Sequence, residues 1–436
     1  MQLYQGPIMT GTRPMGLGGA YAGIAEGVEG TPLNAAAPAV RTPFSLDWID
    51  YDLGASVAFP GTFTATDFDN RGSKANRRRF NNFLYVNVGA EVQIGYFGAA
   101  ITGDLQQFVL TPSRAGSPGL TLEVGRWHAV GAYGFFGDQV VVGAGLRAVT
   151  MQISERAGVV PNGSVLTTVG VGPEVGVLVK LDKHPWRIGA TVRAPVSASN
   201  ATARAADFAL PREVVQPWEI ELGGALQAGP RPLNPGWLNP RAYEGAVRES
   251  VIEERRRRTK EEAAAIESTP FSERAEKYRS LAERERSLRN AEDARLDAES
   301  RRLHAILRAR YLNWPSERLL LVASVLITGP SARAVAVESF LDQKYEPFGD
   351  HVTVAPRLGI ESEPVQERLR ARVGTYVEPS RVSTSDPRQH FTAGMELKLA
   401  SFDFWGVLGD TMWGVRLAGD VAPRYFNWGF GLGAWH

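Results

Sequence analysis

The sequence predicts an all-β membrane fold: an antiparallel transmembrane β-barrel of about 14 strands, with an N-terminal plug and a periplasmic α-helical insert. Two observations support this prediction. From residue 44 onward, apolar residues alternate with small or polar ones in long segments that short turns separate. Between 231 and 316 the alternation stops, and strong helix formers and charges replace it.

The alternation is clearest in residues 165–181, where the odd positions are almost all apolar and the even positions are mostly small, polar or charged. A strand of this length is unusual in a soluble sheet, whereas a barrel strand needs one lipid-facing and one lumen-facing side. Aromatic residues near expected strand ends, such as Trp48 and Trp218, suit interfacial girdles. The same pattern predicts fourteen strands, at 45–60, 82–93, 96–110, 119–135, 139–155, 165–181, 186–198, 214–228, 317–329, 351–361, 367–378, 389–401, 410–420 and 424–435.

The composition fits a barrel and narrows the function classes. The chain has 436 residues, with 46 Gly, 27 Pro and no Cys, and its formal net charge is +1. Repeated Gly suits strands that bend and pack closely, and the lack of Cys excludes disulfides and thiolate chemistry. A nearly neutral chain has no bulk attraction for nucleic acid, so we expect no nucleic-acid partner.

Export of such a barrel requires a signal peptide, and none is visible. The start, Met1-Gln2-Leu3-Tyr4, has neither a basic stretch nor an apolar core. We therefore expect the numbering to begin at or near the mature terminus of a Gram-negative outer-membrane protein. We divide the chain into a plug over 1–43, strands one to eight over 44–230, the insert over 231–316, and strands nine to fourteen over 317–436.

The insert is expected to form two helices, which break at Ser268-Thr269-Pro270. Strand parity places it on the periplasmic side. Two interpretations stay open: a self-packed helical hairpin with solvated charged faces, or a coiled coil through which 241–315 dock a periplasmic or outer-membrane protein partner. The candidate docking residues form a sparse apolar seam of Tyr278, Leu281, Leu288, Leu296 and Leu303.

The N-terminal segment is rich in Gly and Ala, and small residues allow the close backbone packing that a plug needs. Its candidate hatch and ligand residues are Arg13, Met15, Gly16, Gly18, Gly19, Asn34 and Pro38. These residues resemble the N-terminal hatch of the FadL family of outer-membrane transporters for long-chain fatty acids and other hydrophobic molecules. They are also similar to the related PorV-type proteins of type IX secretion. Those families carry Arg, then Met-Gly-x-Gly-Gly-Ala, and later Asn-Pro-Ala, from which the longer spacing between Asn34 and Pro38 departs.

The resemblance implies a barrel whose hatch blocks straight-through flow, with hydrophobic substrate leaving sideways into the lipid bilayer. The expected lumen is nevertheless rich in charges of both signs, which can pair and fill it. The lumen charges with the clearest inward phase are Glu174, Arg187, Arg193, Arg368, Arg370, Arg372 and Glu396.

Two function classes follow from these patterns. One is passive uptake of a hydrophobic small molecule, with the lipid and lipopolysaccharide bilayer and that ligand as partners. The other is a non-transport adaptor or anchor in an envelope or secretion machine. We expect no enzyme, cofactor or metal site, because the His residues show no metal-ligand spacing. His351 beside Asp350, or His390 near Asp386, would only imitate a catalytic pair.

Overall fold

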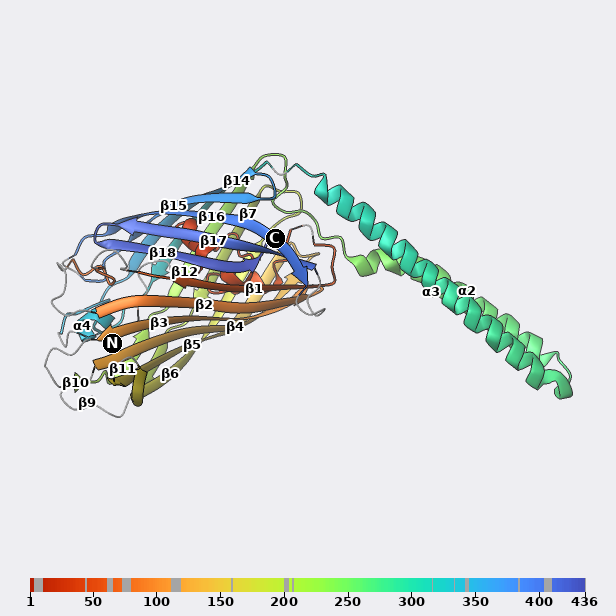
Figure 1. Cartoon of the computed structure of the whole chain (residues 1–436), viewed down its shortest axis with the longest axis horizontal. Coiled ribbons are helices and arrows are strands. Elements are labelled where there is room, and N and C mark those ends of the chain that lie inside the picture. Colours follow the sequence, from red (N-terminus) through yellow and green to blue (C-terminus); the bar gives the residue numbers. More distant parts are fainter. Residues whose placement is uncertain are drawn as a thin grey trace. The chain divides into compact units, whose positions relative to one another are not determined.

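The computed structural model describes most of the chain, in two compact units (Figure 1). The first unit comprises Met1–Pro43, Ile49–Gly236 and Pro315–His436, and the second comprises Phe44–Trp48 and Trp237–Trp314. The described residues are 1–3, 11–43, 45–60, 66–72, 80–110, 119–157, 160–199, 204–205, 208–315, 317–332, 334–341, 345–382, 385–403, 410–435.

The first unit is a closed antiparallel barrel, in which β1 pairs with β18 to complete the ring. The predicted 14-stranded barrel is therefore confirmed. Its strands are β1 (Ile49–Ala58), β2 (Phe80–Ile94), β3 (Phe97–Leu110), β4 (Gly119–Phe135), β5 (Val140–Ala157), β6 (Val160–Val179), β7 (Trp186–Arg193), β12 (Glu219–Ala228), β13 (Leu319–Thr328), β14 (Thr353–Val365), β15 (Leu369–Glu378), β16 (Arg388–Asp403), β17 (Asp410–Ala422) and β18 (Tyr425–Ala434).

The outer surface of the barrel is apolar. Ile101, Val169 and Phe391 are more than half exposed, while their neighbours in the same strands point inward and are buried. Water would penalise so large an exposed apolar surface, and the hydrocarbon layer of a membrane does not. None of the described helices is long and apolar enough to cross a membrane.

The two ends of the barrel differ in their connections. At the turn end, β2 joins β3 through Gly95-Tyr96, and β14 joins β15 through 366–368; the helical insert also leaves and returns here. At the loop end, the longer connections include α4 (Val337–Leu341) and the short strands β9 (Arg204–Ala205) and β10 (Phe208–Ala209). These names, turn end and loop end, are used below.

Two predicted strands are shorter in the structure, because Pro residues end them. The segments 186–198 and 214–228 are interrupted at Pro195 and Pro217, which lack the N–H that a ladder needs. Residues beyond these breaks form a separate hairpin, β8 (Val196–Ser199) with β11 (Glu213–Gln216). The barrel wall is therefore lower at β7 and β12 than at β6.

The hatch fills the turn-end half of the barrel with little regular structure. It contains the short helix α1 (Thr12–Gly16) and two 3-10 turns, η1 (Val28–Gly30) and η2 (Ala37–Ala39). Leu17, Tyr21 and Ile24 are buried in an apolar cluster with Leu320 and Val322 of β13. The segment therefore packs as an interior element against the inward face of the wall.

The second unit is a helical hairpin, formed by α2 (Pro240–Glu267), the 3-10 turn η3 (Phe271–Glu273) and α3 (Arg274–Leu312) (Figure 1). Asn239 caps α2 by accepting a hydrogen bond from the N–H of Arg241 at 3.0 Å. At the base, the Trp48 and Trp237 rings lie 5.9 Å apart, and the Arg241 guanidinium stacks 3.9 Å over Trp48.

Ion pairs join the two helices. Arg255 donates to Glu292 at 2.7 Å, and Arg258 donates to Glu285 at 3.3 Å and also to Glu292. The predicted docking leucines lie on this same face of α3 and are half-buried: Leu281, Leu288, Leu296 and Leu303. Tyr278 is exposed. The arrangement corresponds to the self-packed hairpin, in which these four leucines are partly covered.

We expect acid to destabilise this hairpin. Hydrogen bonds from Arg258 hold the pKa of Glu292 at about 2, below the usual 4.5. Since the folded-state pKa is the lower one, the stabilisation is present above pH 4.5 and is lost as the pH falls from 4.5 towards 2. Circular dichroism melting of the helices should show this loss, and Glu292→Gln should largely abolish it.

The control for this prediction is Glu299→Gln, which removes a carboxylate from an exposed pair with Arg302 at 3.7 Å. Exposed pairs of this kind contribute little to stability. A melting temperature of the helices that shows the same dependence on pH in wild type and in Glu292→Gln would contradict the assignment.

Candidate functional site

The hatch touches the barrel wall at many of the glycines that the wall presents to the lumen. If the ring of inward glycines carried Cβ atoms, those atoms would collide with the hatch. For Gly98 the added Cβ would lie 1.7 Å from the Pro38 carbonyl oxygen, and for Gly143 it would lie 1.8 Å from the Ala35 carbonyl oxygen. The wall glycines that meet the hatch in this way are Gly54, Gly89, Gly98, Gly143, Gly176, Gly189, Gly223, Gly359, Gly374, Gly394 and Gly431.

The predicted hatch residues take part in this packing. Gly16 lies against Gly394 with its virtual Cβ 3.2 Å from the Gly394 Cα, and Gly18 and Gly19 adopt positive φ values of 62° and 73°. L residues with side chains rarely adopt such angles. Met15 is buried beneath Tyr425 and Tyr85. Gly16, Gly18 and Met15 therefore pack the hatch against the barrel wall.

Asn34 links the hatch to itself and to the wall. Its Nδ2 donates to the carbonyl oxygens of Ala22 at 2.9 Å and Val177 at 3.2 Å, and its Oδ1 accepts from the N–H of Ala36 at 3.0 Å. The residue is fully buried, and all three contacts are to backbone. The longer spacing before Pro38 is accommodated by η2, which contains Pro38.

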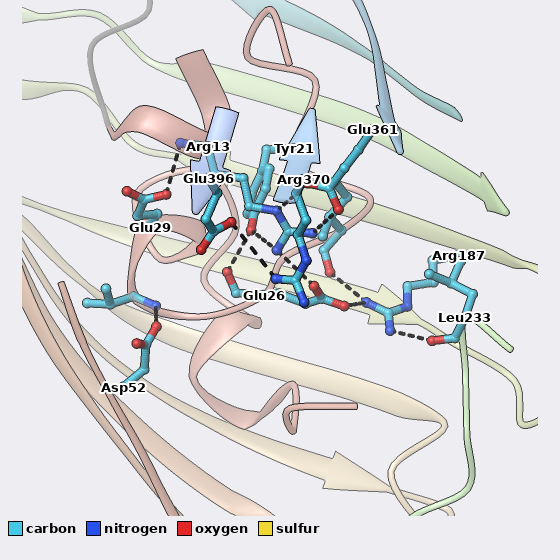
Figure 2. Close-up of polar contacts among 12 residues, drawn as sticks. Arg13, Tyr21, Glu26, Glu29, Asp52, Arg187, Leu233, Glu361, Arg370 and Glu396 are labelled. Atoms are coloured by element: carbon cyan, nitrogen blue, oxygen red, sulfur yellow. Dashed lines mark hydrogen bonds and ion pairs between the residues drawn. The ribbon is translucent and has the colours of Figure 1, made fainter. Parts of the chain in front are cut away.

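Arg13 is the central cation of the hatch (Figure 2). Its Nε and Nη2 donate to the two carboxylate oxygens of Glu361 at 2.9 and 3.1 Å, and its Nη1 donates to Glu26 at 3.0 Å and to the Tyr21 hydroxyl at 2.9 Å. Bidentate pairing of this kind fixes orientation as well as charge. Arg13 thus joins the hatch to β14.

Glu361 is the anion at which several wall residues converge. Its side chain has no solvent exposure, and besides Arg13 it accepts hydrogen bonds from Arg372 at 2.6 Å and Arg318 at 3.1 Å. Arg372 continues the chain of contacts to Glu396, which also accepts from Arg416 Nε at 2.8 Å. The wall next to the hatch is therefore a continuous network of paired charges.

Of the remaining predicted lumen charges, Glu174, Arg187, Arg193 and Arg370 are buried inside the barrel, and Arg368 is not. The Glu174 carboxylate lies 2.9 Å from the His128 Nδ1 and 3.9 Å from the Arg193 Nε. Arg187 is buried beside the hatch, and Arg370 stacks 4.0 Å over the Trp435 ring. The prediction for Arg368 was wrong: it is exposed in the turn before β15, because the alternation of the sequence continues past the end of the strand.

The loop-end half of the lumen is apolar along β3 to β6, which the sequence analysis did not anticipate. The inward faces of four strands carry fully buried apolar side chains here, and the β8–β11 hairpin and α4 cover them. The members of this loop-end cluster are Phe108, Leu122, Val124, Val149, Met151, Ile153 and Leu166 from β3 to β6, with Val196, Leu210, Val214, Val337, Phe340, Met1 and Leu3.

Arg126 lies where the inward face of β4 changes from apolar to polar. It follows Leu122 and Val124 on the same face, and it is 6% exposed. Its Nη1 lies 3.5 Å from the Gln106 Oε1, and its Nε has no hydrogen-bond partner among the described residues. The buried carboxylate of Asp104 lies opposite Arg126 on β3, so the guanidinium has an anion nearby, but its Nε hydrogen is left for another acceptor. The site therefore favours a ligand group that accepts a hydrogen bond.

The wall beside the loop-end cluster is interrupted. The pairing of β6 with β7 covers Glu174 to Val179, although β6 extends to Val160. A Cβ added at Gly170 would lie 3.1 Å from the Ser197 carbonyl oxygen and 3.3 Å from the Ala198 Cβ. The β8–β11 hairpin therefore covers the inward face of β6 at the place where the neighbouring strand has ended.

The two His–Asp pairs considered in the sequence have different surroundings. His351 contacts Asp350 at 2.7 Å in an exposed loop, which lowers the pKa of the Asp350 carboxyl. His390 is buried between Asp420 and Glu378, each at 2.8 Å, and not beside Asp386. Within the described ranges, no three His, Asp or Glu side chains are grouped to hold a metal ion.

Comparison with known proteins supports the fold. No family model matches the chain. No curated protein matches it either. A FadL homologue from Pseudomonas aeruginosa is 10% identical, with 97% of each chain covered and a TM-score of 0.50. The CymD monoaromatic hydrocarbon channel (12% identity, 97% and 96% coverage, TM-score 0.47) and the Pseudomonas putida toluene transporter TodX (11%, 100% and 97%, 0.46) were also found. The chain thus has a FadL-like barrel fold.

We expect Gly98→Val to loosen the hatch. The new side chain would displace the Pro38 carbonyl, whose oxygen lies 1.7 Å from the added Cβ, so amide protons of residues 35–40 should exchange about tenfold faster. Gly131→Val is the matched control, because the nearest atoms to its Cβ are 3.8 Å away on the Phe97 ring. Equal exchange in the two variants would rule out glycine contact as the basis of hatch seating.

Proposed function

We propose that this chain is an outer-membrane barrel that takes up hydrophobic small molecules passively. The observation that supports this function best is the apolar loop-end cluster inside the lumen. A barrel that served only as an anchor would not need an apolar interior at its loop end. The turn end then faces the periplasm, as short turns do in bacterial barrels, and the loop end faces outward.

The ligand would be amphipathic, such as a long-chain fatty acid. The loop-end cluster offers aliphatic and aromatic side chains, among them Leu122 and Met151, for an apolar tail. Arg126 lies next to it on β4 and offers a buried donor to a head group. A few placed polar groups in an otherwise apolar site are typical of small-molecule recognition.

The route out of the lumen would be lateral. The glycine-seated hatch and its ion pairs obstruct the turn end, so a ligand in the loop-end cluster has no open axial path. The wall at this level is interrupted beyond β7, and the β8–β11 hairpin covers that place from the inside. A movement of this hairpin would connect the loop-end cluster with the surrounding bilayer.

The adaptor hypothesis lacks a comparable observation. The leucines that would dock a partner face α2 instead, and Tyr278 alone of the candidate seam is exposed. The surface of the hairpin carries charges of both signs, so it does not favour a partner of either charge. Uptake is therefore the function that the described residues favour.

The lateral route can be tested with a reversible crosslink, since the natural chain has no Cys. In the double variant Gly170→Cys/Ala198→Cys the two Cβ atoms would lie 3.3 Å apart, close to the roughly 3.5–4.5 Å of disulfides. Oxidation should abolish uptake of a labelled fatty acid and of toluene by a Gram-negative host that lacks its own channel. Reduction should restore uptake.

The control is Ala129→Cys/Leu146→Cys, which joins paired, outward-facing positions of β4 and β5. Its uptake should be the same oxidised and reduced. Undiminished uptake by the oxidised Gly170→Cys/Ala198→Cys variant, in which β6 is joined to β8, would contradict the lateral route. If the wild-type chain fails to raise uptake of either compound above that of empty cells, the uptake function itself is wrong.

A further inference from the structure

The first connection between the hatch and the helical hairpin is the tether that leads from the hatch to β1. This tether, Phe44–Trp48, belongs to the compact unit of the helices and not to the barrel. Trp48 packs 5.9 Å from the Trp237 ring, and the Arg241 guanidinium covers Trp48 at 3.9 Å. The chain that leaves the hatch is thus held by the beginning of α2.

The second connection is the segment that precedes α2. Leu233 is buried among hatch side chains that include Leu17 and Tyr21. Arg187 donates to the Leu233 carbonyl at 2.9 Å and to Asn234 at 2.7 Å. The same guanidinium donates to two hatch groups, the Ile24 carbonyl at 3.1 Å and the Glu26 carboxylate at 2.6 Å (Figure 2). Arg187 therefore binds the hatch and the root of the hairpin together.

The third connection is the segment that follows α3. Arg318 lies just before β13 and donates to Glu361 at 3.1 Å. Glu361 is the carboxylate that holds Arg13 of the hatch in a bidentate pair. Displacement of Arg318 would remove one of the three cations around a carboxylate that has no solvent exposure. Loss of a partner from a buried ion pair is strongly unfavourable, so the network around Arg13 must then rearrange.

We infer from these three connections that the helical hairpin controls how firmly the hatch is seated. Both roots of the hairpin and the hatch's own tether meet the residues that fix the hatch. A displacement of the hairpin base therefore changes the contacts of Arg13, Glu26 and Trp48 at once. The hairpin gives the compartment at the turn end a means of loosening the hatch. This coupling does not depend on which molecule the barrel transports.

The test compares hydrogen exchange of the hatch in full-length and shortened proteins in lipid nanodiscs. Replacing 241–312 with a short Gly-Ser linker removes the hairpin and Arg241, and should speed exchange in 14–33 at least tenfold, with β4 and β5 unchanged. Replacing only 259–284 with a short Gly-Ser turn keeps the base and leaves Arg258, Glu285 and Glu292 able to pair across the hairpin. This second variant should exchange like wild type.

Two outcomes would overturn the inference. One is wild-type exchange of the hatch after removal of the whole hairpin. The other is equal acceleration in both deletion variants, which would show that the base contacts are not what matters. If the larger deletion does not yield a folded barrel, Trp48→Ala at the tether provides the same test. It should accelerate exchange in 14–33, whereas Arg302→Gln, at an exposed position of α3, should not.

Discussion

The burial of Glu361 between Arg13, Arg318 and Arg372 is the constraint on which the rest of the molecule depends. A carboxylate without solvent exposure is stable only while its cations stay in place. These three cations come from the hatch, from the root of the insert and from β15. The pairing therefore joins the hatch to β14 and β15 of the barrel wall and to Arg318, which follows the insert in the chain. The ring of glycines then allows the hatch backbone to lie directly on the wall.

The consequence is a lumen with two unlike halves. The turn-end half is filled by the hatch, by its apolar contacts with the wall and by paired charges. The loop-end half is apolar along β3 to β6, where Arg126 stands at the boundary, and it carries buried charges such as Glu378 and Asp420 along β15 to β17. A hydrophobic molecule would be stable only on the loop-end side of that boundary. Its exit would then pass through the interrupted wall beyond β7 and not through the hatch. Uptake and hatch control then involve different parts of the structure.

Much of the fold could be predicted from sequence, because a barrel wall imposes a period of two on every strand. The segment 165–181 shows this well, since its odd positions face outward and its even positions face inward. The alternation wrongly predicted that Arg368 faces the lumen, because the pattern continues beyond the end of the strand. Pro195 ended a strand that alternation alone would have extended. Contacts between segments that are distant in the sequence could not be predicted either. Neither the three cations around Glu361 nor the loop-end cluster is visible from local pattern, since both are assembled from distant segments.

The most direct test of the central claim is a cryo-electron microscopy structure of the protein in nanodiscs with a long-chain fatty acid. The account expects acyl density among Leu122, Met151 and Phe108, with the carboxylate within hydrogen-bond distance of the Arg126 Nε. The hatch should keep the pair between Arg13 and Glu361. Acyl density along the barrel axis through a displaced hatch, or a loop-end cluster that stays closed at saturating fatty acid, would contradict it.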